Sequence, residues 1–144
     1  MLISVRLYIQ GDDLQPGDIT RLLGVQPTRS HARGDTRTLP DGKVVAEKIG
    51  VWVWKTGVDA DDAKLSDCVQ ALQRAFGHSA EALAALPNAE ATWIDVHVVE
   101  ELALGNDDDA EVVFTLASQD IGALKALGLP VEFTVSVGQS DEPA

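Results

Sequence analysis

The fold is decided by residues 2–9, which read LISVRLYI. Every second position carries a branched apolar side chain, and Arg6 and Tyr8 lie among the positions between them. This period of two is typical of a strand that is buried on one face. We therefore expect the chain to open with a strand whose two faces have different environments.

The remaining strands and helices are predicted from the same kinds of pattern. A short amphipathic helix is expected from Pro16 to Gly24, where an apolar stripe lies between a helix-starting proline and a helix-ending glycine. Between residues 26 and 48 we expect a long basic loop with a small hairpin that turns at residues 41–42. Further strands are expected at 49–56, 91–100, 111–116 and 131–137, and further helices with Asp61 and Asp62 in the first turn up to Gly77, from a Ser79 cap to Pro87, and from a Ser118 cap to Gly128.

The order of these elements predicts a single α+β domain over residues 1–138, followed by a polar tail at 139–144. We expect an antiparallel or mixed sheet of about five main strands with the helices packed on one face. Two similar stretches, 18–24 and 120–128, follow strands near the two ends of the chain. They predict a division into two ferredoxin-like halves.

Composition is that of an ordinary globular protein. Of 144 residues, 45% are hydrophobic and 24% are charged, as in average soluble domains. The chain does not open with a basic region followed by an apolar run, and its apolar stretches are too short to cross a bilayer. The single Cys68 cannot form an internal disulfide, which suits a reducing compartment. We expect a cytoplasmic protein without a membrane partner.

Charge is distributed unevenly along the chain. Residues 21–55 hold seven of the eleven Lys and Arg and only three acidic residues, whereas the whole chain has a net charge of −12. The segment is thus a candidate surface for an anion or an acidic partner. Because the rest of the chain repels phosphate backbones, we do not expect nucleic acid as a partner.

The strand patterns also predict a second, aromatic face of the sheet. If all branched faces point toward the helices, Trp52, Trp54 and Trp93 fall together on the opposite face with Tyr8, while the three Phe fall on the helix side. A face with three Trp is too apolar to be left in water over a large area. Three coverings are open: the loop 26–48, a second copy or another protein, and a small molecule held between loop and sheet.

A basic motif, Arg29-x-His31-x-Arg33, lies in the loop. In an extended backbone the three side chains share one side and can bind a carboxylate or a phosphate. We therefore expect the residues that bind a ligand or partner to be Arg6, Tyr8, Arg29, His31, Arg33, Trp52, Trp54, Trp93 and His97.

No catalytic, metal or cofactor site is predicted. Asp95 and His97 lie two apart on one strand face, a spacing at which a carboxylate can orient an imidazole, but no motif ties a nucleophile to them. The three His and one Cys lack the spacing of a zinc site, and the acidic run 107–109 lacks the spaced ligands of a calcium loop.

Four short motifs resemble a known family: GDDL-x-P at 11–16, ITRLLG-x-x-PT at 19–28, GD at 34–35 and G-x-W at 50–52. Together they resemble the small bacterial domain-of-unknown-function family 4279. The resemblance implies a single α+β domain in bacteria and structural importance for the first helix, the turn at residues 27–28 and Trp52. It implies no activity.

These observations predict a noncatalytic cytoplasmic domain that binds a protein partner or an anionic small ligand through the Trp-rich face and the basic loop. One form of this hypothesis is an immunity- or antitoxin-like protein, whose acidic surface would block a basic toxin. The alternative is a small enzyme that acts on an anionic substrate. In that alternative Arg29 and Arg33 hold the substrate, and His31 or His97 transfers protons.

Overall fold

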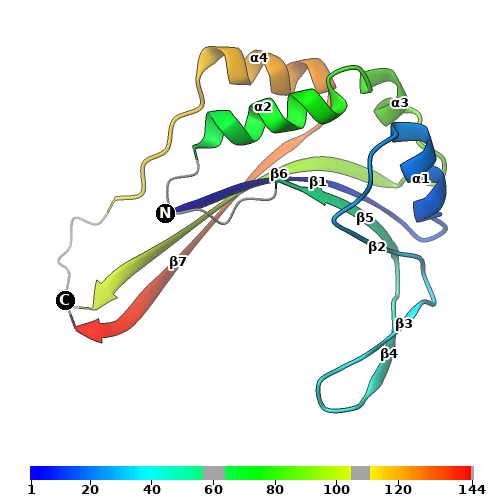
Figure 1. The fold of residues 1–144 in the computed structure, drawn as a ribbon, viewed down its shortest axis with the longest axis horizontal. Coiled ribbons are helices and arrows are strands. Elements are labelled where there is room, and N and C mark those ends of the chain that lie inside the picture. The colour runs from blue at the N-terminus through cyan, green and yellow to red at the C-terminus, as the bar shows by residue number, and fades with distance from the viewer. Residues whose placement is uncertain (57–63, 105–110, 144) are drawn as a thin grey trace.

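The structure is a computed structural model that describes residues 1–56, 64–104 and 111–143. Four helices lie over one main sheet, and a small hairpin projects from it (Figure 1). The helices are α1 (Pro16–Leu23), α2 (Leu65–Phe76), α3 (Ala80–Ala84) and α4 (Ser118–Leu127). The strands are β1 (Leu2–Gly11), β2 (Arg29–His31), β3 (Thr36–Thr38), β4 (Val44–Ala46), β5 (Gly50–Lys55), β6 (Ala91–Leu104) and β7 (Val131–Pro143).

The main sheet is mixed. Its strands follow the order β2-β5-β1-β6-β7, and all neighbours are antiparallel except β6 and β7, which are parallel. The β3–β4 hairpin forms a separate two-stranded sheet. Figure 1 shows α2 and α4 side by side on one face of the main sheet. These features confirm the predicted α+β class with a mixed sheet and helices on one face, whereas the ferredoxin-like division stays a prediction.

The predicted helix ends are confirmed where glycine allows the turn. α1 begins at Pro16 and ends at Leu23, and Gly24 caps it with a φ of 68° and donates its N–H to the carbonyl of Thr20. The cap predicted for the last helix is wrong, because Ser118 is the first residue of α4 and Ala117 occupies the cap position. Residues 61 and 62, predicted in a first helical turn, lie outside the described residues.

The strand predicted at 111–116 is wrong. This segment is extended, with Val112, Phe114 and Leu116 half-buried against the core, yet it pairs with no strand in the described part of the chain. The place beside β6 that a hairpin partner would fill is occupied by β7, which reaches it by a parallel crossover through α4. The fifth strand of the sheet is instead β2, which comes from the predicted loop.

The register between β1 and β5 decides which side chains enter the core. Trp52 lies opposite Ile9 and Trp54 lies opposite Leu7, and both of these β1 side chains are buried under the helices. Residues directly opposite in an antiparallel pair share a face, so both indoles point toward the helices. The prediction that Trp52 and Trp54 lie on the outer face is therefore wrong, whereas Trp93, which lies opposite Tyr8, does lie there.

Close packing shows why the indoles take the inner face. Trp52 is fully buried and its Nε1–H donates to the Oγ1 of Thr20 at 3.0 Å. Phe76 of α2 receives both indoles edge-on, with ring centroids 6.2 Å from Trp52 and 5.2 Å from Trp54. Both faces of β5 are apolar, so alternation alone could not choose between them. The larger rings gain more from burial, and one of them finds a hydrogen-bond acceptor there.

Two glycines fix this register. Gly11 lies opposite Gly50 at the end of the β1–β5 pair. A Cβ on Gly50 would lie 2.8 Å from the Cβ of Leu14 and 2.9 Å from the carbonyl oxygen of Gly11, and a Cβ on Gly11 would clash with the carbonyl of Asn88. The backbone segments therefore approach each other here more closely than a side chain at either glycine position would allow.

The predicted loop 26–48 does not fold over the outer face of the sheet. Its first part forms the edge strand β2, and its second part forms the β3–β4 hairpin, which extends away from the end of the sheet (Figure 1). The hairpin turn predicted at residues 41–42 is confirmed, with Gly42 at a φ of 88°. Among the described residues, no helix is long and apolar enough to span a membrane.

Removing the acceptor of the buried indole should destabilise the fold. In Thr20→Val the indole N–H of Trp52 keeps its burial and loses its acceptor, and we expect the free energy of unfolding to fall by about 1–3 kcal/mol. Urea denaturation followed by far-ultraviolet circular dichroism measures this. The matched control Thr36→Val, at an exposed position of β3, should change the value by less than about 0.5 kcal/mol. Equal effects of the two substitutions would contradict the inward position of Trp52.

Candidate functional site

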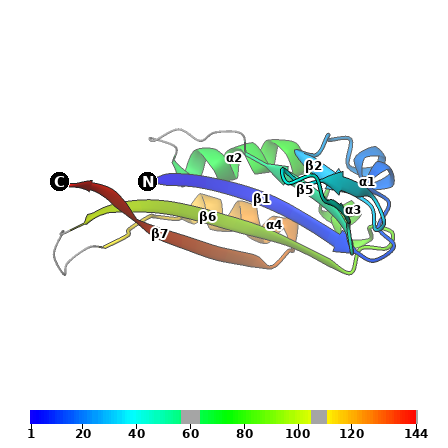
Figure 2. The same cartoon turned by 90° about the horizontal axis from the view of Figure 1, so that it is seen from below.

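The outer face of the sheet, on the side away from the helices, carries most of the remaining candidate residues. Tyr8 of β1 lies between Val53 of β5 and Trp93 of β6 in register. Figure 2, seen from below, shows the strands that present this face. Tyr8 stacks on Trp93 with ring centroids 5.1 Å apart and an interplanar angle of 12°. The predicted aromatic face thus consists of one stacked pair.

Tyr8 is also oriented by a neighbouring cation. The Nη1 of Arg6 donates to the hydroxyl oxygen of Tyr8 at 3.2 Å. Because the phenol oxygen accepts this bond, its own proton is free to be donated to a ligand. The Arg6 Nε–H is buried and has no hydrogen-bond partner in the described part of the chain. Such an orphaned donor is uncommon in folded proteins.

A pocket of about 200 Å³ lies next to this pair. Its floor is the buried side chain of Val53, and its rim comes from β1, β5 and the start of β2. Thr28 holds the rim in place, since its N–H donates to the carbonyl of Val53 at 2.7 Å and its Oγ1 accepts from the N–H of Lys55 at 2.9 Å. The residues that line the pocket are Arg6, Tyr8, Thr28, Arg29, Val53 and Lys55.

Three cations meet at this pocket in a chain with a net charge of −12. Arg6 lies directly opposite Lys55, and Arg29 lies opposite Val53 on the same face. Like charges that face each other across strands destabilise a sheet. Within residues 1–56, 64–104 and 111–143, neither Arg6 nor Arg29 forms an ion pair with a carboxylate. A bound anion would bring a counter-charge to Arg6 and Arg29.

On the other side of β1, two polar residues of β6 on the outer face form hydrogen bonds to β7. Asp95 lies across from Arg6 on β6, but its Oδ1 accepts from the hydroxyl of Thr134 at 2.8 Å. His97 Nε2 lies 3.1 Å from the Oγ of Ser136. Asp95 and His97 therefore each bond to β7, and the general-base arrangement considered from the sequence does not form.

The three residues of the basic motif, Arg29, His31 and Arg33, do not come together in one site. Arg33 pairs with Asp13 at 3.0 Å, and His31 Nε2 lies 3.4 Å from a carboxylate oxygen of Glu47. Glu47 also pairs with Arg37 at 2.9 Å. Of the three motif residues, only Arg29 reaches the pocket.

The candidate residues thus divide into two groups. The pocket brings together Arg6, Tyr8 and Arg29, with Trp93 beside them. His31, Arg33, Trp52 and Trp54 lie elsewhere, and His97 lies further along β6. The pocket residues not predicted are Thr28, Val53 and Lys55. The sequence could have indicated Lys55. Lys55 is two residues from Val53 and therefore shares the face of Val53 once β5 is assigned with the indoles inward.

Metal and thiol chemistry find no support in the described residues. No group of three His, Cys, Asp or Glu there could hold a metal ion, and the acidic run 107–109 lies outside the described residues. Cys68 is buried in α2, and this burial raises the pKa of its thiol, which the nearby Asp67 raises further and a hydrogen bond with Thr56 lowers. A buried thiol with a raised pKa is a poor nucleophile.

Comparison with known proteins identifies the family. A family model described as "Domain of unknown function (DUF4279)" matches residues 1–138. The chain belongs to the DUF4279 family. This confirms the resemblance seen in the four sequence motifs, and the pocket lies wholly within the DUF4279 domain. No curated protein and no solved structure matches the chain.

Repulsion between Arg29 and Arg6 predicts that removing one of the two charges stabilises the domain. At low salt, Arg29→Gln should raise the free energy of unfolding by about 0.2–1 kcal/mol, because a like charge near Arg6 is lost. Lys48→Gln, an equal charge change at an exposed position, should alter it by less than about 0.5 kcal/mol. Urea titrations in low and high salt measure both, and the gain should shrink as salt screens the charges. Destabilisation by Arg29→Gln at low salt would show that Arg29 already has a favourable partner.

Proposed function

We propose that this DUF4279 domain is a noncatalytic binding domain that recognises an anionic group in the pocket on the outer face of the sheet. The convergence of Arg6, Arg29 and Lys55 beside the hydroxyl of Tyr8 carries the proposal. Arginine forks can make two parallel hydrogen bonds to a carboxylate or a phosphate, and these charge-assisted bonds are stronger than neutral ones. The orphaned Nε–H of Arg6 would gain an acceptor from such a group.

The size of the pocket limits the ligand. A cavity of about 200 Å³ is smaller than the ~300–1,000 Å³ typical of sites that enclose a whole small molecule. The ligand should therefore insert one anionic head group and lay the rest of its structure on the surface. The stacked pair of Tyr8 and Trp93 next to the pocket offers a flat apolar platform for that remainder.

The anionic head group can belong to a small ligand or to an acidic side chain of a protein partner. The chemistry at the pocket is the same for both sources. Tyr, Trp and Arg are the residues most enriched at the energetic centres of protein interfaces, and all three types meet here.

Binding is better supported than turnover. The enzyme alternative requires Arg29 and Arg33 to hold a substrate near His31 or His97. Arg33 is instead paired with Asp13, and the two imidazoles contact Glu47 and Ser136 outside the pocket lining. No residue in the lining combines a nucleophile with a neighbouring base.

An immunity- or antitoxin-like role is a second form of the proposal. Asp13 and Glu47 already pair with Arg33 and Arg37 of the basic segment, and Glu47 also contacts His31. The net charge of −12 favours fast association with a basic protein. A cytoplasmic, bacterial setting fits this role and the single reduced Cys68.

Titration with an anion tests the proposal. In ¹⁵N-labelled protein at constant ionic strength, sodium phosphate should cause saturable shifts of the amide signals of Tyr8, Thr28 and Val53. Arg29→Glu should weaken this binding at least tenfold, because it replaces a donor with a repelling charge. Lys48→Glu, with the same charge reversal at an exposed position, should leave binding within about twofold.

Further variants and ligands separate the alternatives. His31→Ala and His97→Ala should leave phosphate binding unchanged, since neither residue lines the pocket. An acidic peptide that produces the same shifts would assign the head group to a protein partner. A basic protein that binds wild type and Arg29→Glu equally would favour the immunity-like form. Phosphate binding that is absent, or unaffected by Arg29→Glu, would refute the anion pocket.

A further inference from the structure

The strand β7 ends the main sheet and leaves one edge open. Its N–H and C=O groups alternate between β6 and this edge, as in any strand. The N–H of Ile94 on β6 donates to the carbonyl of Pro130 at 2.9 Å, which shows that even-numbered residues of this strand face β6. The amides and carbonyls of Val131, Phe133, Val135 and Val137 therefore point to the open edge.

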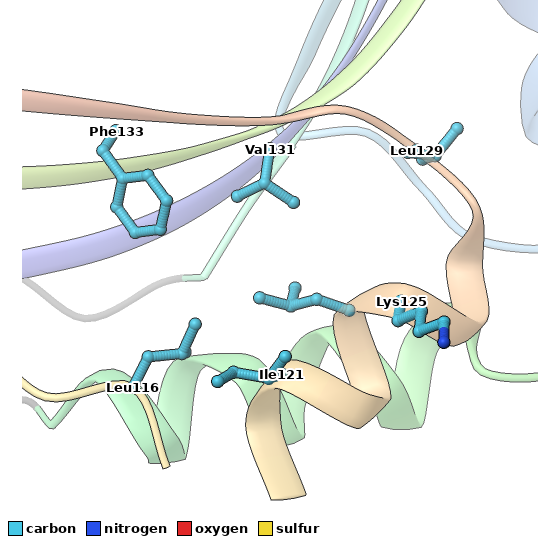
Figure 3. Close-up of a pocket in the computed structure, with 7 residues that line it drawn as sticks. Leu116, Ile121, Lys125, Leu129, Val131 and Phe133 are labelled. Atoms are coloured by element: carbon cyan, nitrogen blue, oxygen red, sulfur yellow. The ribbon is translucent and has the colours of Figure 1, made fainter. Parts of the chain in front are cut away.

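The same four residues form an apolar stripe that the helices do not seal. Phe133 is 50% exposed, Val135 46% and Val137 54%. Figure 3 shows Phe133 and Val131 facing Leu116 and Ile121 of the α4 side across a cavity of about 220 Å³. Of the eight large hydrophobic side chains that are exposed in the described part of the chain, Phe133, Val135 and Val137 lie on β7 and Ile121 lines the same cavity.

The first eight residues of β7 also lack the devices that usually keep edge strands apart. Natural edges carry lysines, prolines or bulges that prevent pairing with another chain. Between residues 131 and 138 the only charged side chain is Glu132, and there is no proline or lysine. The irregularity in the β6–β7 pair lies far along the strands, at residues 103–104. An unprotected apolar edge of this kind is expected to be covered.

We propose that a second copy of this chain covers it, through antiparallel pairing of β7 with β7 across a two-fold axis at Val135. This register sets Phe133 opposite Val137 of the second copy and Glu132 opposite its Gly138. An aromatic residue opposite a β-branched one is a stabilising pair, and no like charges face each other. The open-edge amides and carbonyls of the odd-numbered residues become hydrogen-bonded pairs.

Geometry and charge favour a second copy over other occupants. The two-fold axis stands perpendicular to the sheet, so both copies place α4 on the same face, where the two helices flank and shelter the apolar stripe. Two chains of net charge −12 repel each other, and they can associate only through a nearly neutral strip. β7 supplies such a strip from residue 133 to 138. This interface is independent of the anion pocket, which lies at the opposite edge of the sheet beside β2.

Sedimentation equilibrium tests the proposal. The wild type should show a concentration-dependent mass that approaches twice the 15.3 kDa of the chain. Val135→Lys should be monomeric over the same range, because it brings two cations face to face at the axis. The matched control Val44→Lys makes the same change at an exposed position of β4 and should still dimerise. A wild type that is monomeric throughout, or a Val135→Lys variant that dimerises like Val44→Lys, would overturn the proposal.

A cross-linking variant tests the register and does not depend on tolerance of a lysine. Hydrogen-bonded antiparallel pairs have Cα atoms about 5.5 Å apart, within the range that disulfides span. Val135→Cys should therefore form a covalent dimer under mild oxidation, whereas Val44→Cys should not, and the native Cys68 is buried. Failure of Val135→Cys to cross-link, or equal cross-linking of both variants, would contradict pairing about Val135.

Discussion

The close approach of β1 and β5 is the constraint on which the rest of the structure depends. Gly11 faces Gly50 at the end of the pair, where backbone and Leu14 leave no room for a Cβ. This contact fixes the register and so the face on which every side chain of β5 lies. A shift by one residue would exchange the faces and expel Trp52 from a site where its N–H is bonded to Thr20.

The pocket that we propose to bind an anion is a consequence of that register. With the indoles of β5 inward, the small side chain of Val53 takes the outer face and leaves room for a pocket. Lys55 then lies beside Arg6, and the edge strand β2 brings Arg29 to the same place. The two edges of the sheet thus differ in chemistry: cationic and polar beside β2, apolar and nearly neutral at β7.

Local sequence patterns predicted much of the fold. The faces of β5 and the partner of β6 depend on long-range strand pairing, which local patterns do not contain. The alternation in residues 2–9 and the glycine at 24 identified β1 and the end of α1, because both signals are contained within a few residues. Residues 50–55 are apolar on both faces, so only pairing with β1 could orient them. Residues 111–116 alternate like a strand, but β7 takes the partner position. Charge counting found Arg29 but could not foresee which loop cations acidic neighbours would neutralise.

Nuclear Overhauser contacts of the indole rings test the β1–β5 register most directly. Protons of Trp52 and Trp54 should show cross-peaks to the ring of Phe76, and those of Trp93 should show cross-peaks to Tyr8. These results would place two indoles in the core and one on the outer face. Cross-peaks from Trp52 and Trp54 to Tyr8, without contacts to Phe76, would show the opposite register and contradict both the core and the pocket described for this domain.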